Sequence, residues 1–311
     1  MDEELLSVRV AELYYDAGKT QDEIGALLDV SRFKVGRLLT RARESGIVRI
    51  EIVHPSARRL SLEHALVDRY PRLADAVVVP AAGDADLTVR VAQAAADHLR
   101  ALRPVPRVLG VSWGRTLTAV AAHLPDGWAH GVTVVQVNGG VSVNRRPGGA
   151  AHLAVLIAER AAGEAVLLPS PAILEQEETA RAIQSDRTVA AVLELAARAQ
   201  AYVFSAGVCD ATSAHVENGY LDHSGIRMLR QRGAVGDVLG RYIDAEGHIV
   251  DPALDARTVG MPLPQLRAAQ TAIFVTAGSA KHDLARTVVG TGLCTVIVTD
   301  EDTARALLED Q

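Results

Sequence analysis

Apolar residues follow two different spacings along this chain, and the spacing changes after about residue 75. In the first part, residues such as Leu6, Val10 and Leu13 recur every three or four positions, which is the spacing of an amphipathic helix. From Ala76 onward, short continuous apolar runs alternate with alanine-rich stretches. The sequence therefore predicts a small helical domain followed by a larger domain of strands and helices.

The first part predicts three helices. One runs from Glu3 to Ala17 and ends at Gly18, because glycine commonly closes a helix. Thr20 stands three residues before Glu23, the spacing of a capping box, so a second helix begins there. Ser31 is a natural N-cap for the third helix. The residues expected to face the core are Leu6, Val10, Leu13, Tyr14, Ile24, Leu27, Leu28, Val35, Leu38 and Leu39.

The third helix is basic, with five Lys or Arg residues and no acidic residue between Ser31 and Arg43. Two helices joined by a tight turn, the second of them basic, are typical of a helix-turn-helix DNA-binding domain. Side chains in its first turn would reach base edges, and later arginines would contact phosphates. The alternative is a basic face that is merely solvated. The predicted DNA-binding residues are Thr20, Ser31, Arg32, Phe33, Lys34, Arg37, Arg41 and Arg43.

The overall charge is acidic, with a formal net charge of −6 and with 8 Lys or Arg against 10 Asp or Glu in residues 1–54. Local placement matters more than this balance, because screening acts over about 8 Å at physiological ionic strength. The acidic groups at 2–4 and 22–23 lie outside the basic segment in sequence, so we expect the basic face to act alone. An alternating strand at 47–53 would form a wing beside it.

The larger part predicts an α/β fold. Continuous apolar strands separated by helices are typical of a mostly parallel, doubly wound sheet that is covered on both faces. Ligands of such sheets bind beyond the carboxyl ends of the strands. The expected strands are 76–80, 107–111, 132–137, 165–169, 201–207, 272–278 and 294–299, and the expected helices include 88–102, 185–199 and 299–308.

Candidate ligand-binding residues follow the first of these strand ends, in the run GVSWGRTL at 110–117. A strand runs there into a glycine-bearing turn, and a helix starts near Arg115. Backbone N–H groups and nearby hydroxyls of such a turn would hold a phosphate or a sugar hydroxyl, although these turns also occur for packing alone. The candidates are Gly110, Ser112, Gly114, Arg115 and Thr116.

Two further strand ends add candidates. In VNGGVS at 137–142, Asn138 offers a donor and an acceptor, and Gly139 and Gly140 let backbone approach a ligand, unless this is a plain turn. In GAVGD at 233–237 and AGSAKHD at 277–283, Asp237 would accept hydrogen bonds from sugar hydroxyls. Lys281 at a helix start would suit an anion, the alternative being a solvated lysine.

Other polar and aromatic residues give weaker signals. The histidines His215, His223 and His282 show no paired spacing and are expected at the surface or in loops. Trp113 fits a core residue and a stacking platform equally well. Cys209 and Cys294 have no metal-ligand spacing, which predicts two buried thiols and no metal or other cofactor.

At 311 residues the chain exceeds what one hydrophobic core usually serves. We therefore expect a DNA-binding domain at 1–54, a linker and short helix at 55–75, and a ligand-binding and oligomerisation domain at 76–311. The short helix would either dock on the large domain or pair with its copy in another subunit. An acidic N-terminus and the lack of an apolar run of about 20 residues predict a cytoplasmic protein with no membrane segment.

Three runs carry a family resemblance: VSRFKVGRLLTRARESGIVRIEI at 30–52, GAVGDVLGRYIDAEG at 233–247 and TAGSAKHDLARTVVGTGLCTVIVTDE at 276–301. They resemble the SorC family of sugar-binding transcriptional regulators, and the resemblance covers essentially the whole chain. It implies a winged helix-turn-helix and a sheet similar to those of ribose-5-phosphate isomerase and glucosamine-6-phosphate deaminase. It also favours ligand roles for the 110–117 turn and for Lys281.

The chain departs from this family at two places. Relatives often carry a serine where this chain has Gly36, so a hydroxyl contact to phosphate is missing. Some relatives carry a lysine near the second strand end that could form an imine with an open-chain sugar aldehyde. Val137 and Asn138 stand there in this chain, which predicts reversible, non-covalent binding.

Two functions fit these features. The first is a transcriptional regulator, a repressor of a carbohydrate catabolic operon, which binds double-stranded operator DNA and responds to a sugar, polyol or sugar-phosphate effector. One reader per chain contacts a half-site, so we expect a homodimer or homotetramer on a pseudo-palindromic operator. The second is a sugar-phosphate isomerase or deaminase, which needs a general base and acid. Asp210, Glu217 and Asp237 form no such arrangement in sequence, and an enzyme of this kind has no use for a helix-turn-helix.

Overall fold

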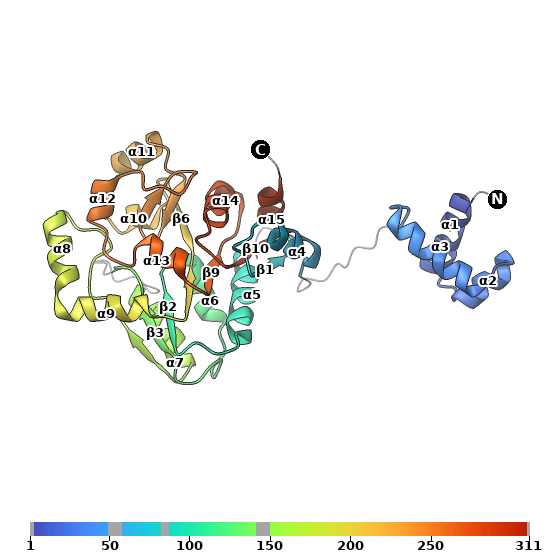
Figure 1. Ribbon diagram of the computed structural model, residues 1–311, viewed down its shortest axis with the longest axis horizontal. Helices are drawn as coiled ribbons and strands as arrows, with labels where there is room; N and C mark the ends of the chain where they lie inside the picture. Colours follow the sequence, from blue (N-terminus) through green and yellow to red (C-terminus); the bar gives the residue numbers. More distant parts are fainter. Residues whose placement is uncertain (1–2, 49–57, 82–86, 141–149, 310–311) are drawn as a thin grey trace. The chain divides into compact units, whose positions relative to one another are not determined.

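The computed structural model describes residues 3–48, 58–81, 87–140 and 150–309. The chain consists of two compact units, Met1–His54 and Pro55–Gln311 (Figure 1).

The first unit is helical. It consists of α1 (Glu3–Ala11), a π-helical turn η1 (Glu12–Asp16), α2 (Gln21–Leu28) and α3 (Arg32–Glu44). The capping box at Thr20 and Glu23 is present, and the Ser31 hydroxyl accepts a hydrogen bond from the Lys34 N–H at 3.3 Å. The expected wing at 47–53 falls almost wholly outside the described residues.

The core of this unit lies between the three helices, where Val10, Ile24 and Val35 are fully buried. Two expectations about this core were wrong, because Tyr14 is 37% exposed and Leu27 is 59% exposed. The wider π-helical turn rotates Tyr14 away from the inward line of α1. In α2, Ile24 and Leu28 face the core, and Leu27 lies beside that line.

The second unit contains a seven-stranded sheet in which every pairing is parallel. Its strands occur in the order β1-β10-β9-β5-β2-β3-β4. Each matches a predicted apolar run, so the expectation of a mostly parallel α/β domain is confirmed. The bounds are β1 (Asp75–Val79), β2 (Val108–Val111), β3 (Thr133–Gln136), β4 (Glu164–Val166), β5 (Ala201–Phe204), β9 (Ala272–Val275) and β10 (Val296–Asp300).

Helices cover both faces of this sheet, as Figure 1 shows. Successive strand residues point to opposite faces, so Val77 and Val79 pack in one apolar cluster and Ala76 and Val78 in another. The first cluster is closed by α5 (Leu87–Ala101), α6 (Arg115–His123) and α7 (Ala150–Arg160). The second is closed by α4 (Leu60–Arg69), α9 (Arg187–Ala197), α13 (Leu263–Ala268), α14 (His282–Gly290) and α15 (Glu301–Leu308).

The short helix α4 belongs to this unit. Leu66 is fully buried against the sheet, and the buried carboxylate of Glu63 binds Arg58 and accepts the Val78 N–H at 2.8 Å. Arg59 binds Glu301 at 2.7 Å. Docking on the large domain is therefore the observed one of the two arrangements left open for this helix.

A second, smaller sheet was not predicted. Its strands β6 (Ala206–Val208), β7 (Gly236–Val238) and β8 (Arg241–Ile243) are antiparallel. Three-residue strands are too short to show a periodicity, and β6 follows β5 so closely that the run 201–207 resembles one strand. The helices α8 (Glu177–Ser185), α10 (Ala214–Glu217), α11 (His223–Gln231) and α12 (Pro252–Ala256) complete the unit.

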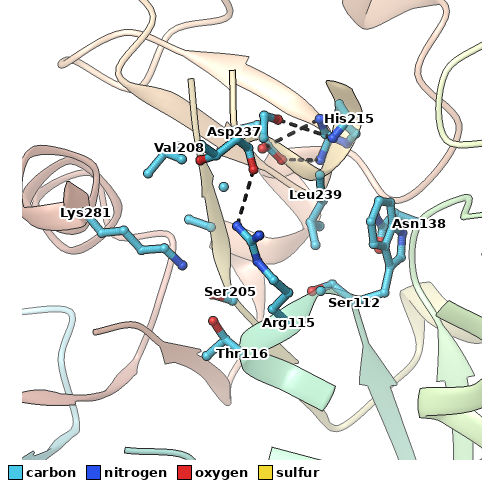
Figure 2. A pocket seen from close by; sticks show the side chains of 18 residues that line it. Ser112, Arg115, Thr116, Asn138, Ser205, Val208, His215, Asp237, Leu239 and Lys281 are labelled. Atoms are coloured by element: carbon cyan, nitrogen blue, oxygen red, sulfur yellow. Dashed lines mark hydrogen bonds and ion pairs between the residues drawn. The ribbon is translucent and has the colours of Figure 1, made fainter. Parts of the chain in front are cut away.

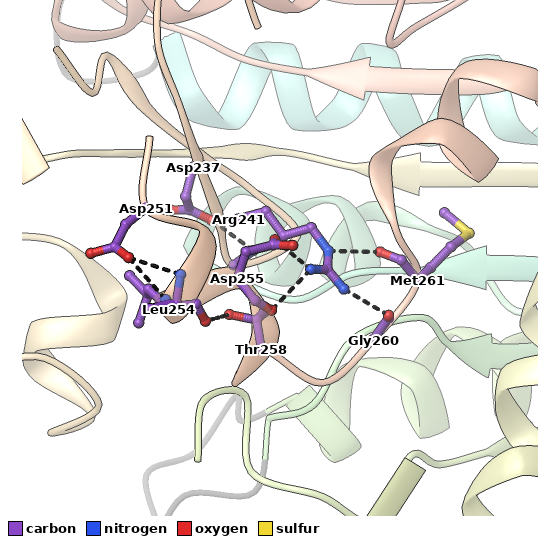
Figure 3. A network of polar contacts seen from close by, with 10 residues as sticks. Asp237, Arg241, Asp251, Leu254, Asp255, Thr258, Gly260 and Met261 are labelled. Carbon is purple, nitrogen blue, oxygen red and sulfur yellow. Dashed lines mark hydrogen bonds and ion pairs between the residues drawn. The ribbon is translucent and has the colours of Figure 1, made fainter. Parts of the chain in front are cut away.

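A buried arginine links the two sheets (Figure 3). Arg241 binds the Asp255 carboxylate at 2.5 Å and donates to the carbonyls of Gly260 and Met261 at 3.0 and 3.2 Å. The 259–261 segment in turn pairs with the end of β3, because the Met261 N–H donates to the Val137 carbonyl at 2.8 Å. The segment that carries Asn138 is thereby held against the 259–261 segment.

Cys209 and Cys294 are free and buried, as predicted. Within the described ranges, no helix combines the length and the apolar character needed to cross a bilayer.

Candidate functional site

Six of the eight predicted DNA-binding residues lie on α3. A shallow hollow runs along α3 beside the start of α2, and the predicted residues Arg32, Phe33, Arg37 and Arg41 line it. Thr20 and Ser31 instead cap α2 and α3, and Lys34 and Arg43 lie outside the hollow. The lining is completed by Gln21, Gly36, Thr40 and Glu44.

Acidic residues lie closer to this face than their sequence positions suggested. Asp22 is 3.6 Å from Arg32, and Glu3 is 2.7 Å from Arg41. The expectation that these acids act apart from the basic segment was therefore wrong, since α1 and α2 pack beside α3. Exposed ion pairs contribute only about 0–1 kcal/mol, so a phosphate can replace either carboxylate.

The second unit contains a cavity at the carboxyl ends of β2, β3 and β5, in the position that its fold class predicts. Its interior volume is about 90 Å³ and its mouth is open, so it is smaller than the roughly 300–1,000 Å³ typical of sites for drug-sized ligands. Seven of the ten predicted ligand-binding residues line it: Ser112, Gly114, Arg115, Thr116, Asn138, Asp237 and Lys281. Figure 2 shows the side chains of six of them, which come from several elements: Ser112, Arg115, Thr116, Asn138, Asp237 and Lys281.

Several groups that line the cavity are neutral and polar. Ser112 and Asn138 are each only 3% exposed. The Oγ atoms of Ser112 and Ser205 and the Oδ1 atom of Asn138 are buried and have no hydrogen-bond partner among the described residues. Because buried polar atoms are nearly always hydrogen-bonded, these three atoms are candidates to bind a ligand.

Other lining groups are charged. Burial lowers the pKa of Lys281, the Asp237 carboxylate opposes this shift, and the positive charge of Arg115 adds to it. Arg115, at the start of α6, is largely exposed and binds Glu217 at 3.2 Å. An anion placed here would meet two cations and the amino end of a helix.

Asp237 belongs to a buried polar group that the sequence did not predict. His215, expected at the surface or in a loop, is only 3% exposed. Its Nδ1 atom lies 3.0 Å from the Tyr242 hydroxyl and 3.8 Å from Asp237. Burial raises the pKa of Asp237, and His215 and the N–H of Gly240 oppose the rise. The N-capping Ser213 two residues earlier is the local signal that could have placed His215 on a short helix.

The three remaining predicted residues do not line the cavity. A side chain at Gly110 would overlap the ring of Tyr202, so this glycine serves packing. A side chain at Gly139 would overlap the Pro171 carbonyl oxygen, and the Gly140 N–H donates to the Ser170 carbonyl at 3.0 Å. These glycines hold the end of β3 against the 170–171 loop.

Trp113 combines both roles left open for it. Its ring is partly buried against the apolar cluster beneath the cavity, and it also lines the cavity, edge-on to His215 at 5.8 Å. Its indole N–H donates to the Gly139 carbonyl at 2.8 Å, which fixes the plane of the ring. Further lining residues that the sequence did not single out are Ser205, Gly207, Val208, Thr212, Ser213, Ala214, Leu239 and Gly240.

Comparison with known proteins places this architecture. The family model described as "Putative sugar-binding domain" matches residues 54–309. The deoxyribonucleoside regulator of Bacillus subtilis (strain 168) is 30% identical over 310 residues, which is 99% of each chain. The erythritol catabolism regulatory protein EryD of Brucella abortus (strain 2308) is 28% identical, covering 97% of this chain and 96% of that protein.

A solved structure extends the similarity to the whole chain. The full-length sorbitol operon regulator SorC from Klebsiella pneumoniae superposes with a TM-score of 0.71 at 26% identity, covering 99% of this chain and 100% of that one. These relatives are named as regulators, so the isomerase or deaminase alternative is not favoured, and the protein is a regulator rather than an enzyme. From the family match over residues 54–309 and the relatives aligned along nearly its full length, the chain belongs to the SorC family of sugar-binding transcriptional regulators.

Proposed function

We propose that a sugar, polyol or sugar-phosphate effector binds the cavity of the second unit and thereby changes the affinity of the first unit for operator DNA. The observation that carries this proposal is the combination of two kinds of polar group in one cavity. Neutral buried groups without a hydrogen-bond partner among the described residues line it together with the cations Lys281 and Arg115. A molecule that carries both hydroxyls and a negative charge satisfies both kinds of group.

Six lining residues would then contact the effector directly. Ser112, Asn138 and Ser205 bind hydroxyls of the effector, and Lys281 and Arg115 bind its anionic or most electron-rich end. The Asp237 carboxylate accepts a hydrogen bond from a hydroxyl of the effector, and its contacts with His215 and the Gly240 N–H fix its position. A neutral sugar or polyol would use the same hydroxyl contacts without the ionic ones.

The first unit would read the operator as a winged helix-turn-helix, with α3 in the major groove and the wing at 47–53 beside it. The sheet of the second unit would correspond to that of ribose-5-phosphate isomerase and glucosamine-6-phosphate deaminase. Because one reader covers one half-site, the protein would bind as a dimer or tetramer and repress a carbohydrate catabolic operon until the effector arrives. Relatives named for sorbitol, erythritol and deoxyribonucleosides support this class of target.

A thermal-shift screen of the full chain against sugars, polyols and their phosphates tests the cavity assignment. A ligand at 100 times its dissociation constant stabilises the native state by about 2.7 kcal/mol, which is readily detected. Binding that survives unchanged in a Lys281→Met variant would remove Lys281 from the site. A screen with no hit of any class would contradict the proposal.

The DNA-binding face is tested by comparing two arginines. Arg32→Ala should weaken binding to the selected operator more than to unrelated DNA, because a first-turn arginine reads bases. Arg41→Ala should weaken all duplexes alike and reduce the salt dependence by about one unit of slope. Glu3→Gln, which frees Arg41 from its ion pair, is the matched control and should tighten binding slightly to every duplex. Equal losses for both arginine variants on both duplexes would refute this division.

A further inference from the structure

The first turn of α3 exposes a phenylalanine. Phe33 is 84% exposed, and no other large apolar side chain of the described residues is as exposed. The buried side of α3 consists of Val35, Leu38 and Leu39, which lie on the opposite side of the helix. Phe33 therefore contributes nothing to the core, and its ring lies free at the end of the helix that the proposed function places nearest the bases.

The surface around Phe33 leaves room for a partner. Gly36 is three residues further along the same face and has no side chain, so Arg37, four residues along, is the side chain of α3 that follows the ring on this face. Gln21 approaches from α2, its Oε1 atom 3.5 Å from where a Cβ of Gly36 would lie. The result is a hollow with an apolar ring at its start, the low backbone of Gly36 in the middle and Arg37 and Thr40 beyond.

The chemistry of base edges restricts what this ring can recognise. Phenylalanine has no hydrogen-bond donor or acceptor, so it cannot distinguish the polar groups that bases present in the major groove. The one apolar group there is the C5-methyl of thymine. Arg32, which suits guanine, precedes it, so adjacent residues would read two different kinds of base.

On this basis we infer that Phe33 packs on a thymine C5-methyl group and specifies a thymine in each half-site of the operator. The inference rests on the proposed DNA-binding role of α3. It assigns to one side chain a preference that depends on a methyl group and not on phosphate charge, so salt concentration should leave it unchanged.

The test begins with duplexes enriched from a random pool by the full-length protein. Each thymine of the enriched sequence is then replaced singly by deoxyuridine, which removes only the methyl group, and the dissociation constant is measured at fixed salt. We expect one thymine per half-site at which this replacement weakens binding about fourfold, the factor that corresponds to one buried methylene. Phe33→Ala should abolish this sensitivity, and Phe33→Leu should retain part of it.

Leu27→Ala is the matched control, because Leu27 is an exposed apolar residue of the neighbouring helix, 59% exposed. It should leave the deoxyuridine sensitivity intact. If deoxyuridine replacement weakens binding equally in the wild-type protein and in Phe33→Ala at every thymine, the inference is overturned. It is also overturned if replacement at no thymine weakens binding of the wild-type protein, which is the result expected if the ring inserts between bases. If no duplex is enriched at all, the proposed DNA-binding function fails first, so the two failures are distinguishable.

Discussion

The partnerless hydroxyl of Ser112 predicts a substitution that stabilises the protein and weakens its ligand binding. Ser112 is 3% exposed, and its Oγ atom has no hydrogen-bond partner in the part of the chain that the structure describes. An unsatisfied buried polar group costs about 1–3 kcal/mol. Ser112→Ala removes that group with little change in volume. Because the cavity opens to solvent, we take the low end of the range, about 1 kcal/mol, which raises the melting temperature of a domain of this size by about 2–4 °C.

Ser170→Ala is the matched control. Ser170 is fully buried as well, but its hydroxyl donates to the Pro171 carbonyl at 3.0 Å. The same substitution there deletes a hydrogen bond and lowers the stability by about 0.5–1.5 kcal/mol. Differential scanning calorimetry of the effector-free full chain should therefore give shifts of opposite sign for the two variants.

Measurements of effector affinity distinguish a role of the Ser112 hydroxyl in binding from a general effect of the substitution on packing. Ser112→Ala should bind an effector found by the thermal-shift screen about fivefold more weakly, since one hydrogen bond of about 1 kcal/mol is lost. Ser170→Ala should bind it nearly as the wild type does. If the melting temperatures of Ser112→Ala and Ser170→Ala shift in the same direction, or if Ser112→Ala binds the effector as tightly as the wild type, the assignment of the Ser112 hydroxyl to effector binding is refuted.

Three further outcomes follow from the structure. The affinity for an anionic effector should fall as the pH rises through the pKa of Lys281, which is lowered from the ordinary lysine value of 10.5, because the positive charge of the ammonium is then lost. Calorimetric titrations across this pH range should show a smaller fall for Lys281→Arg than for the wild type. Identical pH profiles of the two proteins would exclude Lys281 from effector binding. Gly139→Ala should destabilise the second unit by about 2 kcal/mol or more, because its Cβ would overlap the Pro171 carbonyl; chemical denaturation would show it, and an unchanged midpoint would contradict the packing role. Thr20→Ala should destabilise the first unit by about 1 kcal/mol through loss of the capping box, seen as faster hydrogen exchange in α2; unaltered exchange would argue against the cap.

Local patterns in the sequence were enough to predict much of the fold. The capping box at Thr20 and the N-cap at Ser31 depend on residues three apart, and both are present. The seven parallel strands are continuous apolar runs because both of their faces are buried. The three-residue strands of the second sheet offer no such run, and they were missed for that reason.

The site was predicted in part because strand ends are local features and their surroundings are not. Ser112 and Asn138 follow parallel strands and reach the cavity through the sheet itself. Gly110 and Gly139 also follow or belong to these strands, but distant residues, Tyr202 and Pro171, decide that they serve packing. His215 lies far from Asp237 in sequence, and only the antiparallel β6–β7 pairing brings its segment beside the carboxylate.

The paired acids on the DNA-binding face show the same limit. Glu3 is 38 residues from Arg41 in sequence, yet their side chains meet at 2.7 Å because α1 packs against α3. A count of charges along the sequence treats the two as separate. The basic face of α3 is therefore partly neutralised before DNA arrives, a property that only the packing of the helices reveals.

Fluorescence-anisotropy titration of the full-length protein on its selected operator, with and without an effector from the thermal-shift screen, tests the central claim most directly. We expect the effector to change the operator dissociation constant at least about fivefold, the lower end of typical allosteric coupling. We expect Lys281→Met to bind the operator normally but to lose this response. An operator affinity that is the same with and without saturating effector would contradict the central claim.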